Sequence, residues 1–357
     1  MSAPTPTLPS SSLPSSSTRR QPLPDWYRKL SDYEQPSTPR AVRQLLNTLI
    51  PYAGLWLAMA WMLRHGVSYW GGVFPTAILA GCLLIRVFIF FHDCGHESFF
   101  ASAKANKFFG YLCGILVFTS FEDWRRPHAR HHATAGDQDR RGVGDVWTMT
   151  VEEFKAATPL NRFLYQAYRI PIFMFTFGPG FMFLIGNRFP HRGTSAREKL
   201  STLYTNIGLA VVATVMSFVM GGFTNYLSVQ LPVMLTAATL GVWMFYVQHQ
   251  FEGTYWKPHD EWSPIEAALQ GSSYYKLPKL MQWFTGNIGL HHIHHLRPRI
   301  PNYNLQRCYD EVPAMQNVKP LTILESFKSL NMHLWDEKSE KLISFLEYYR
   351  RTKTAGA

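Results

Sequence analysis

Long apolar segments alternate along this chain with polar blocks that are rich in histidine. A helix needs about 20 mostly apolar residues to cross a bilayer. Four segments meet that requirement, and the sequence predicts a membrane-spanning helix for each: residues 45–63, 73–91, 200–220 and 228–247.

Two further apolar segments are not expected to cross the membrane as single continuous helices. Residues 108–119 are too few, and residues 163–186 are interrupted by Pro171 and by glycines and a proline from Gly178 onward. Arginines gather on both sides of the second segment, and cytoplasmic loops carry an excess of basic residues. Both flanks are therefore predicted to lie on the cytosolic side of the membrane. The segment should then lie in the membrane interface, or dip into the membrane and return to the same side.

The loops after the first and third spans carry no charge beyond Arg64, and are predicted to lie outside. The expected fold is an all-α integral membrane protein. Its four transmembrane helices form two hairpins with both termini in the cytosol, together with interfacial or re-entrant helices and a cytosolic histidine-rich cap. Arg86 is close enough to the cytosolic end of its span for its side chain to snorkel to the interface.

The chain ends are expected to differ from the membrane domain at residues 41–345. Residues 1–40 are rich in Ser, Pro and Thr and lack the apolar stretch of a signal peptide. They are predicted to be a disordered tail rather than a transit peptide, because they have few arginines and no amphipathic period. Residues 346–357 are expected to form a C-terminal tail.

Composition supports a membrane location. Charged residues make up 17% of the 357 residues, whereas soluble domains carry about a quarter. The net charge of +11 comes from basic residues beside apolar runs, which favours a membrane surface and not nucleic acid as the partner. The four cysteines form no CxxC pair, so neither a disulfide framework nor a cysteine zinc site is expected.

Histidines gather in blocks next to the predicted spans. Residues three and four positions apart share one face of a helix, so each block should aim two or three imidazoles in one direction. On such a helix His292 would point about 100° away from His291, so it is left out of the candidate metal ligands. The candidate metal ligands are His92, His96, His128, His131, His132, His249, His291, His294 and His295.

Nine imidazoles are too many for one zinc ion, which is nearly always four-coordinate. They suit two metal ions with four or five ligands each, and imidazole binds iron, copper and zinc. Two redox metals beside a membrane indicate oxygen chemistry on a lipid. The carboxylates of Asp93, Glu97 and Asp145 are expected either to hydrogen-bond ligand imidazoles or to have surface or capping roles. The remaining histidines and Cys94 are expected to be structural or solvated.

Four blocks carry a family resemblance: HDCGHESFF, HARHHATAGD, FYVQHQFEGTYW and GNIGLHHIHHLRPRIPNYNL. They resemble the three histidine boxes and the additional histidine of the membrane fatty acid desaturases. RRGVGDVWTMTVEEF, GSSYYKLPKLMQWFTGNIG and NLQRCYDE are similar to the bacterial acyl-lipid branch. The resemblance extends over about residues 41–340.

This resemblance implies an O2-dependent desaturase that introduces a cis double bond into an acyl chain. It implies two iron ions (Fe2+) held by histidines, O2 as co-substrate, phospholipid or glycolipid acyl chains as substrate, and a ferredoxin-like or cytochrome b5 electron donor. No HPGG motif occurs, so no fused cytochrome b5 domain is expected. Phe245 stands where some acyl-CoA desaturases have asparagine, which disfavours an acyl-CoA substrate.

Two other classes remain open. Diiron membrane hydroxylases, ketolases and alkane monooxygenases share histidine boxes, and they insert oxygen instead of forming a double bond. A metal transporter or a zinc-dependent membrane hydrolase would also use histidine. Transporters place their ligands near the middle of the membrane, whereas these histidines flank the spans. A zinc hydrolase needs about three protein ligands and a water.

Overall fold

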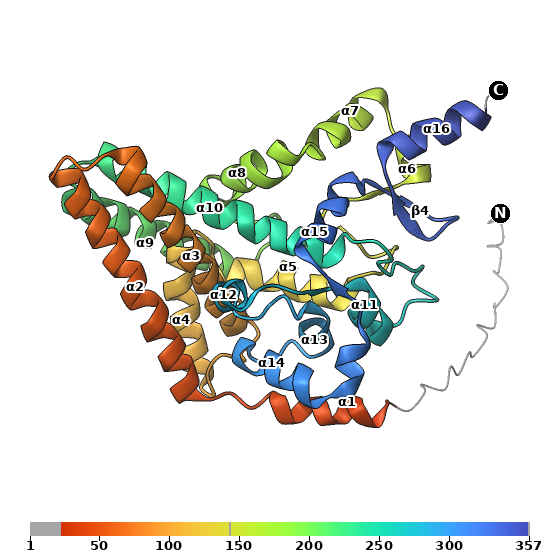
Figure 1. Ribbon diagram of the computed structural model, residues 1–357, viewed down its shortest axis with the longest axis horizontal. Coiled ribbons are helices and arrows are strands. Elements are labelled where there is room, and N and C mark those ends of the chain that lie inside the picture. Colours follow the sequence, from red (N-terminus) through yellow and green to blue (C-terminus); the bar gives the residue numbers. More distant parts are fainter. Residues whose placement is uncertain (1–22, 143, 356–357) are drawn as a thin grey trace, which may run out of the picture.

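Four long helices dominate the structure, a computed structural model that describes residues 23–142 and 144–355 (Figure 1). They are α2 (Thr38–Arg64), α3 (Phe74–Gly95), α9 (Ala196–Met220) and α10 (Phe223–His249), and a π-helical turn, η2 (Tyr69–Val73), leads into α3. All four are long and apolar enough to cross a membrane. They coincide with the four predicted spans and extend each by a few residues, so the prediction of four such helices is confirmed.

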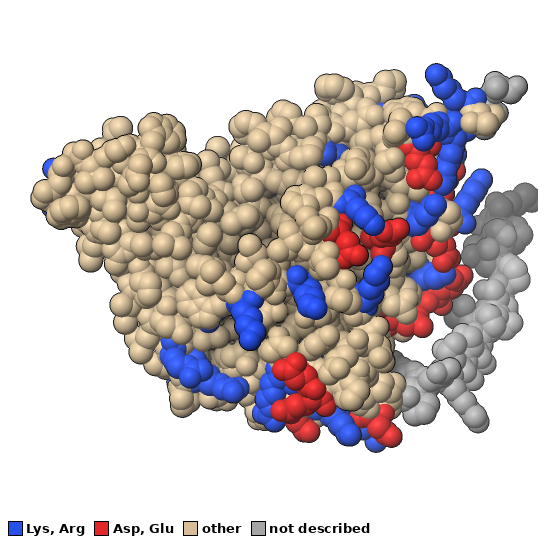
Figure 2. All heavy atoms as spheres, in the orientation of Figure 1, with Lys and Arg blue, Asp and Glu red and all other residues tan. Residues whose placement is uncertain are grey.

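The outer surface of these helices is apolar, as lipid contact requires. Figure 2 shows a broad face that is almost free of Lys, Arg, Asp and Glu over the end of the molecule where α2 and α3 lie, while most charged residues gather on the other side. On α9 exposed apolar side chains recur about every four residues: Leu203, Ile207, Val211, Val215 and Phe218, the last of which is 79% exposed. This apolar surface and the lengths of the helices indicate that the chain is a membrane protein.

Helix α3 is the most buried of the four and packs against α2, α10 and the shorter α4 (Ala103–Leu116). At Gly81 it lies in close contact with α10. A Cβ atom built there would lie 2.6 Å from the Cβ of Thr236 and 2.8 Å from the carbonyl oxygen of Val233. Small residues allow membrane helices to approach closely in this way. The contact sets the spacing of two helices that each end in a histidine-bearing turn.

The two ambiguous apolar segments do not form straight spans. Helix α4 is short, as expected. Residues 159–188 form α7 (Pro159–Tyr168), η3 (Phe173–Phe177), α8 (Gly178–Leu184) and η4 (Gly186–Arg188). The two halves of this region meet at an angle of 72°, and aromatic side chains such as Phe177 and Phe181 are exposed. The bend agrees with the predicted interfacial or re-entrant course.

The rest of the chain packs at one end of the long helices, where the charged residues lie (Figures 1 and 2). Its helices are α5 (Phe121–Thr134), α6 (Val151–Ala156), α11 (Pro264–Gly271), α12 (Lys279–Phe284), α13 (His291–Leu296), α14 (Asn302–Glu311), η5 (Pro313–Asn317), α15 (Ile323–Ser326) and η6 (Phe327–Asn331).

Short strands in this region correct the all-α prediction. β1 (Met149–Thr150), β4 (Leu334–Asp336) and β5 (Lys341–Ile343) form a sheet in the order β1-β4-β5, with a parallel and an antiparallel pairing. β2 (Tyr274–Tyr275) pairs in parallel with β3 (Pro320–Leu321). Strands of two or three residues are too short for an alternating pattern to appear in the sequence.

Both predicted tails contain ordered structure. Residues 1–22 lie outside the described residues, but α1 (Asp25–Lys29) and η1 (Leu30–Tyr33) are helical, and Leu30 and Tyr33 are buried. At the other end α16 (Phe345–Ala355) packs Tyr348 against Phe154. Aromatic and leucine side chains in these two stretches provide apolar area to bury, which the Ser/Pro-rich beginning lacks. Ordered helices thus occur within both stretches that were expected to be tails, while the domain boundaries at 40 and 346 stay predictions.

Arg86 does not reach the surface as predicted, since only 3% of it is exposed. Its guanidinium donates to the Thr48 hydroxyl of α2 at 3.1 Å and to the carbonyl oxygen of Trp283, and it lies 4.3 Å from the Trp283 ring. Helix α12 lies against α3 and supplies these partners. The arginine therefore ties α3 to the segment that precedes the last histidine block.

We expect Gly81→Ala to destabilise the protein by about 1–3 kcal/mol, because its methyl group would force α3 and α10 apart. Thermal unfolding in detergent would measure the change. The matched control is Gly241→Ala on α10, where an added Cβ meets nothing within 4 Å and alanine is the better helix former. Equal unfolding temperatures for the two variants would contradict this account of the α3–α10 contact.

Candidate metal centre

Four segments of the chain deliver the nine candidate histidines to one region. His92 lies in the last turn of α3 and His96 directly follows this helix. Helix α5 carries His128, His131 and His132, and His249 is the last residue of α10. The remaining three lie on the short helix α13. Segments almost 200 residues apart in sequence thus meet here.

The nine side chains form two groups, in each of which one nitrogen per residue lies within 4.8 Å of all the others. The first group is His92, His96, His128, His132 and His294. The second group is His131, His249, His291 and His295. All nine residues selected from the sequence are brought together in this arrangement.

Each block of two or three candidates aims two imidazoles at one group, as expected, but on α5 and α13 the third imidazole points to the other group. On α5, His128 and His132 point to the first group and His131 to the second. On α13 the division is reversed, since His294 joins the first group while His291 and His295 join the second. Positions i and i+4 are about 40° apart on a helix, whereas i+3 lies on the other side of i. Each of these two helices can therefore serve both groups.

The ring nitrogens within each group are spaced as ligands of a common ion would be. In the first group, Nε2 of His128 lies 2.9 Å from that of His96 and 3.2 Å from that of His132. In the second, Nε2 of His249 lies 3.1 Å from that of His131 and 3.0 Å from that of His291. Two metal–nitrogen bonds of about 2.1 Å at right angles separate their nitrogen atoms by about 3.0 Å. The donor set therefore fits two metal ions.

The cluster favours uncharged imidazole, which is the form that binds metal. Burial is the main cause, and neighbouring histidines add to it, because a second positive charge is disfavoured beside the first. Together they lower the pKa well below the usual 6.5 for six residues outside the membrane spans: His96, His128, His132, His291, His294 and His295.

Hydrogen bonds on the far side of three rings fix their orientation. Nδ1 of His92 lies 3.1 Å from Oδ1 of Asp93, and Nδ1 of His131 lies 2.5 Å from Oδ1 of Asp145. Nδ1 of His249 faces the carbonyl oxygen of Gly271 at 3.2 Å. Partners of this kind hold a ligating histidine in place and select the nitrogen that faces the metal. Asp93 and Asp145 thus take the hydrogen-bonding role considered for them, whereas Glu97 pairs with Arg125 instead.

Asp93 is itself held by Asn302, a residue that the sequence did not single out. Its Oδ2 accepts bonds from the backbone N–H and the side-chain amide of Asn302, at 2.7 and 2.8 Å. The Asn302 oxygen in turn accepts from Gln44 of α2. The segment after the last histidine block becomes helical from Asn302 onward in α14. A buried asparagine that acts through a distant aspartate leaves no local pattern in the sequence.

The other histidines lie apart from both groups. His292 is buried, and its Nε2 lies 3.1 Å from the carbonyl oxygen of Met315; burial lowers its pKa to about 4. His191 and His259 pair with Asp123 and Asp137, and His65 lies against the Trp61 carbonyl. His333 stacks on Phe345. Cys94 is fully buried among apolar side chains, as expected of a packing residue.

The second group contains one histidine fewer than the first, and an aromatic ring lies beside it. The ring centroid of Phe245 is 5.3 Å from the rings of both His131 and His249. A cavity of about 20 Å³ adjoins these three side chains. This is enough room for about one small molecule such as water. The second group therefore has space for a small ligand that is not a protein side chain.

We expect Asp93→Asn to lower the affinity of the first group for a divalent metal by about 10–100-fold. An amide at this position can no longer accept every bond that the carboxylate accepts from Asn302 and His92. Metal content measured across a chelator series would test this. The control is Asp123→Asn, which alters a buried carboxylate paired with a histidine outside both groups. Equal losses in both variants would mean that the effect is general destabilisation.

Comparisons with known proteins agree with this geometry. A protein-family model described as "Fatty acid desaturase" matches residues 68–320. A "Fatty acid desaturase" of Bacillus subtilis is 42% identical over 318 residues, which is 89% of each chain. An "sn-1 oleoyl-lipid 12-desaturase" of Synechocystis is 27% identical over 239 residues, 66% of each chain. An "sn-1 acyl-lipid omega-3 desaturase (ferredoxin)" of Synechocystis is 25% identical over 254 residues, 68% of this chain and 66% of the relative.

Proposed function

The chain belongs to the fatty acid desaturase family, and from this premise we propose that it uses O2 to introduce a cis double bond into an acyl chain of a membrane glycerolipid. It is an oxidoreductase of the desaturase class. The observation that carries the proposal is the pair of histidine groups at one end of four membrane-length helices.

The nine histidines are proposed as ligands of two iron ions, five for one ion and four for the other. The spacing of the nitrogens supports this assignment, and so does the burial that lowers the pKa of six of the rings. Imidazole suits iron, whereas a structural zinc site is closed with four ligands. The first group exceeds that number. The space beside the second group supports an additional position for a small molecule such as O2.

Two iron ions held by these histidines would supply, with O2 and two electrons from the donor, the oxidant for removing two hydrogens from neighbouring, unactivated methylenes. The protein's own residues orient and shield that centre. Asp93, Asp145 and the Gly271 carbonyl fix three rings so that each directs Nε2 inward. Phe245 covers one side of the second group and limits the access of water. The substrate chain must present one pair of carbons to this site, and rigid helices provide that positioning.

The relatives support the choice of substrate and donor. Two have lipid-linked substrates in their names, and one of these names ferredoxin. We propose lipid-linked acyl chains as substrates and a ferredoxin-like or cytochrome b5 donor for this chain as well. By the positive-inside rule the histidine groups lie on the cytosolic side, with the long helices as two hairpins and both termini in the cytosol. Exposed basic side chains there, such as Arg130 and Arg140, would attract an acidic electron carrier.

Expression in a host whose membranes contain only saturated and monounsaturated chains tests the reaction directly. Gas chromatography with mass spectrometry should detect a new double bond in the derivatised fatty acids. The double variant His294→Ala/His295→Ala should form none, because each group loses a ligand. His292→Gln should keep activity, since it alters a buried histidine of the same helix outside both groups. A hydroxylated product would instead indicate a diiron hydroxylase.

Iron stoichiometry tests the assignment of ligands. The purified protein should hold two irons per chain, with two Mössbauer signals after loading with iron-57. His96→Ala removes a ligand of the first group alone and His249→Ala one of the second alone, so each should lower the iron content by about one ion and weaken a different signal. Loss of both ions from each variant would argue against separate sites. Activity with zinc, without O2 or reductant, would argue against the redox assignment.

A further inference from the structure

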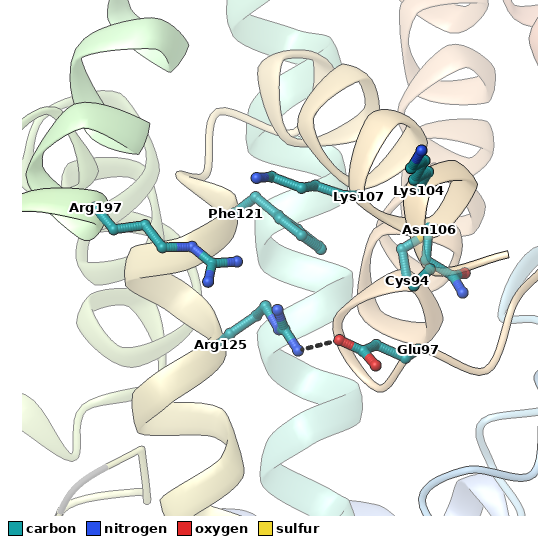
Figure 3. A pocket seen from close by; sticks show the side chains of 9 residues that line it. Cys94, Glu97, Lys104, Asn106, Lys107, Phe121, Arg125 and Arg197 are labelled. Atoms are coloured by element: carbon teal, nitrogen blue, oxygen red, sulfur yellow. Dashed lines mark hydrogen bonds and ion pairs between the residues drawn. The ribbon is translucent and has the colours of Figure 1, made fainter.

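A pocket of about 230 Å³ lies next to the first histidine group (Figure 3). Four elements or their ends form it: the end of α3, the first turns of α4, helix α5 and the start of α9. Its walls consist of Cys94, Glu97, Ala103, Lys104, Asn106, Lys107, Phe121, Arg125 and Arg197. Helix α3 ends here and α9 begins here. The pocket therefore lies where membrane-length helices emerge, at the depth of lipid headgroups.

Positive charge dominates this pocket. Four of its residues are basic and only Glu97 is acidic. Arg125 binds Glu97 at 3.0 Å and Arg197 binds the buried Glu122 at 2.6 Å. Lys104 and Lys107 are exposed and form no ion pair among the described residues. Figure 3 shows Lys107 and Arg197 extending from α4 and α9 on either side of Phe121, with the Arg125–Glu97 pair below.

We propose that this pocket binds the phosphate of a glycerophospholipid and thereby selects phospholipids over neutral lipids as substrates. The inference rests on the proposed function and names its substrate class. Ammonium and guanidinium groups are the usual protein ligands of phosphate. The partly exposed guanidinium groups of Arg125 and Arg197 add to the positive charge that the two lysines present to such a phosphate. A neutral sugar headgroup would leave the charges of Lys104 and Lys107 without a counter-ion.

The pocket is joined to the first histidine group through Arg125. Its Nε donates to the carbonyl oxygen of Gly95 at 3.0 Å, between His92 and His96. Arg125 also precedes His128 by three residues on α5, and Glu97 directly follows His96 with a left-handed φ of 58°. A phosphate bound by Arg125 would thus be linked through this side chain to the turn that carries two candidate ligands. This places the start of the acyl chain close to the centre that is proposed to act on it.

The experiment compares two substrates with the same acyl chains in otherwise identical nanodiscs: phosphatidylglycerol and a neutral glucosyl diacylglycerol. The variants are Lys104→Gln/Lys107→Gln and the control Lys199→Gln/Lys279→Gln, which removes two exposed lysines elsewhere. A basic residue at the lipid surface is worth about 1 kcal/mol, or roughly fivefold. We expect the pocket variant to lose roughly tenfold or more of the preference for phosphatidylglycerol, and the control to keep it.

Lipid retention in native mass spectrometry separates this proposal from the proposed reaction. If no double bond forms in any lipid, the proposed function fails. The phosphate pocket is still supported if the parent and control proteins retain phosphatidylglycerol preferentially and the pocket variant does not. Equal losses in the two double variants would mean diffuse attraction to the membrane and would overturn the proposal. So would equal use of both lipids by the parent protein. Inhibition by glycerol 3-phosphate without discrimination between lipids would assign the pocket to a soluble anion instead.

Discussion

The structure depends on bringing nine imidazoles from four distant segments into two adjacent groups. Such a cluster is unfavourable by itself, because its nitrogens face one another at about hydrogen-bond distance with too few protons to share. Several ring nitrogens, including Nδ1 of His132 and Nε2 of His295, are buried without a hydrogen-bond partner among the described residues. Metal coordination can satisfy the nitrogens that face inward, and it accounts for why the chain keeps this arrangement.

Much of the surrounding fold holds these segments in place. Gly81 lets α3 approach α10 closely, and both helices deliver histidines at the same end. Arg86 ties α3 to α12, the segment before α13, and Asn302 at the start of α14 binds Asp93. The chain on both sides of the last histidine block is thus anchored to the helix that carries the first. Elements that contain no candidate ligand therefore determine where the ligands meet.

The sequence was sufficient for features that repeat or cluster locally. Apolar length located the four long helices, and the histidine spacing identified all nine residues that the structure brings together. Prediction from the sequence failed for features that depend on how distant segments pack together. Arg86 was expected at the interface because α12 could not be known to cover it. The division of the α5 and α13 histidines between two groups was not foreseen, because nothing local reveals that these helices lie between the groups. The role of Asn302 and the short strands likewise depend on partners far along the chain.

The two groups differ in ways that indicate a division of roles. The first has five histidines, is fixed through Asp93 to the membrane helices, and borders the basic pocket through Arg125. The second has four histidines, a small cavity and the Phe245 ring. A site with fewer protein ligands and adjacent space is suited to a small molecule, since an open position is what distinguishes reactive from structural metal sites. Within the proposed function, this asymmetry favours the first group as the side nearer the lipid and the second as the side that admits O2.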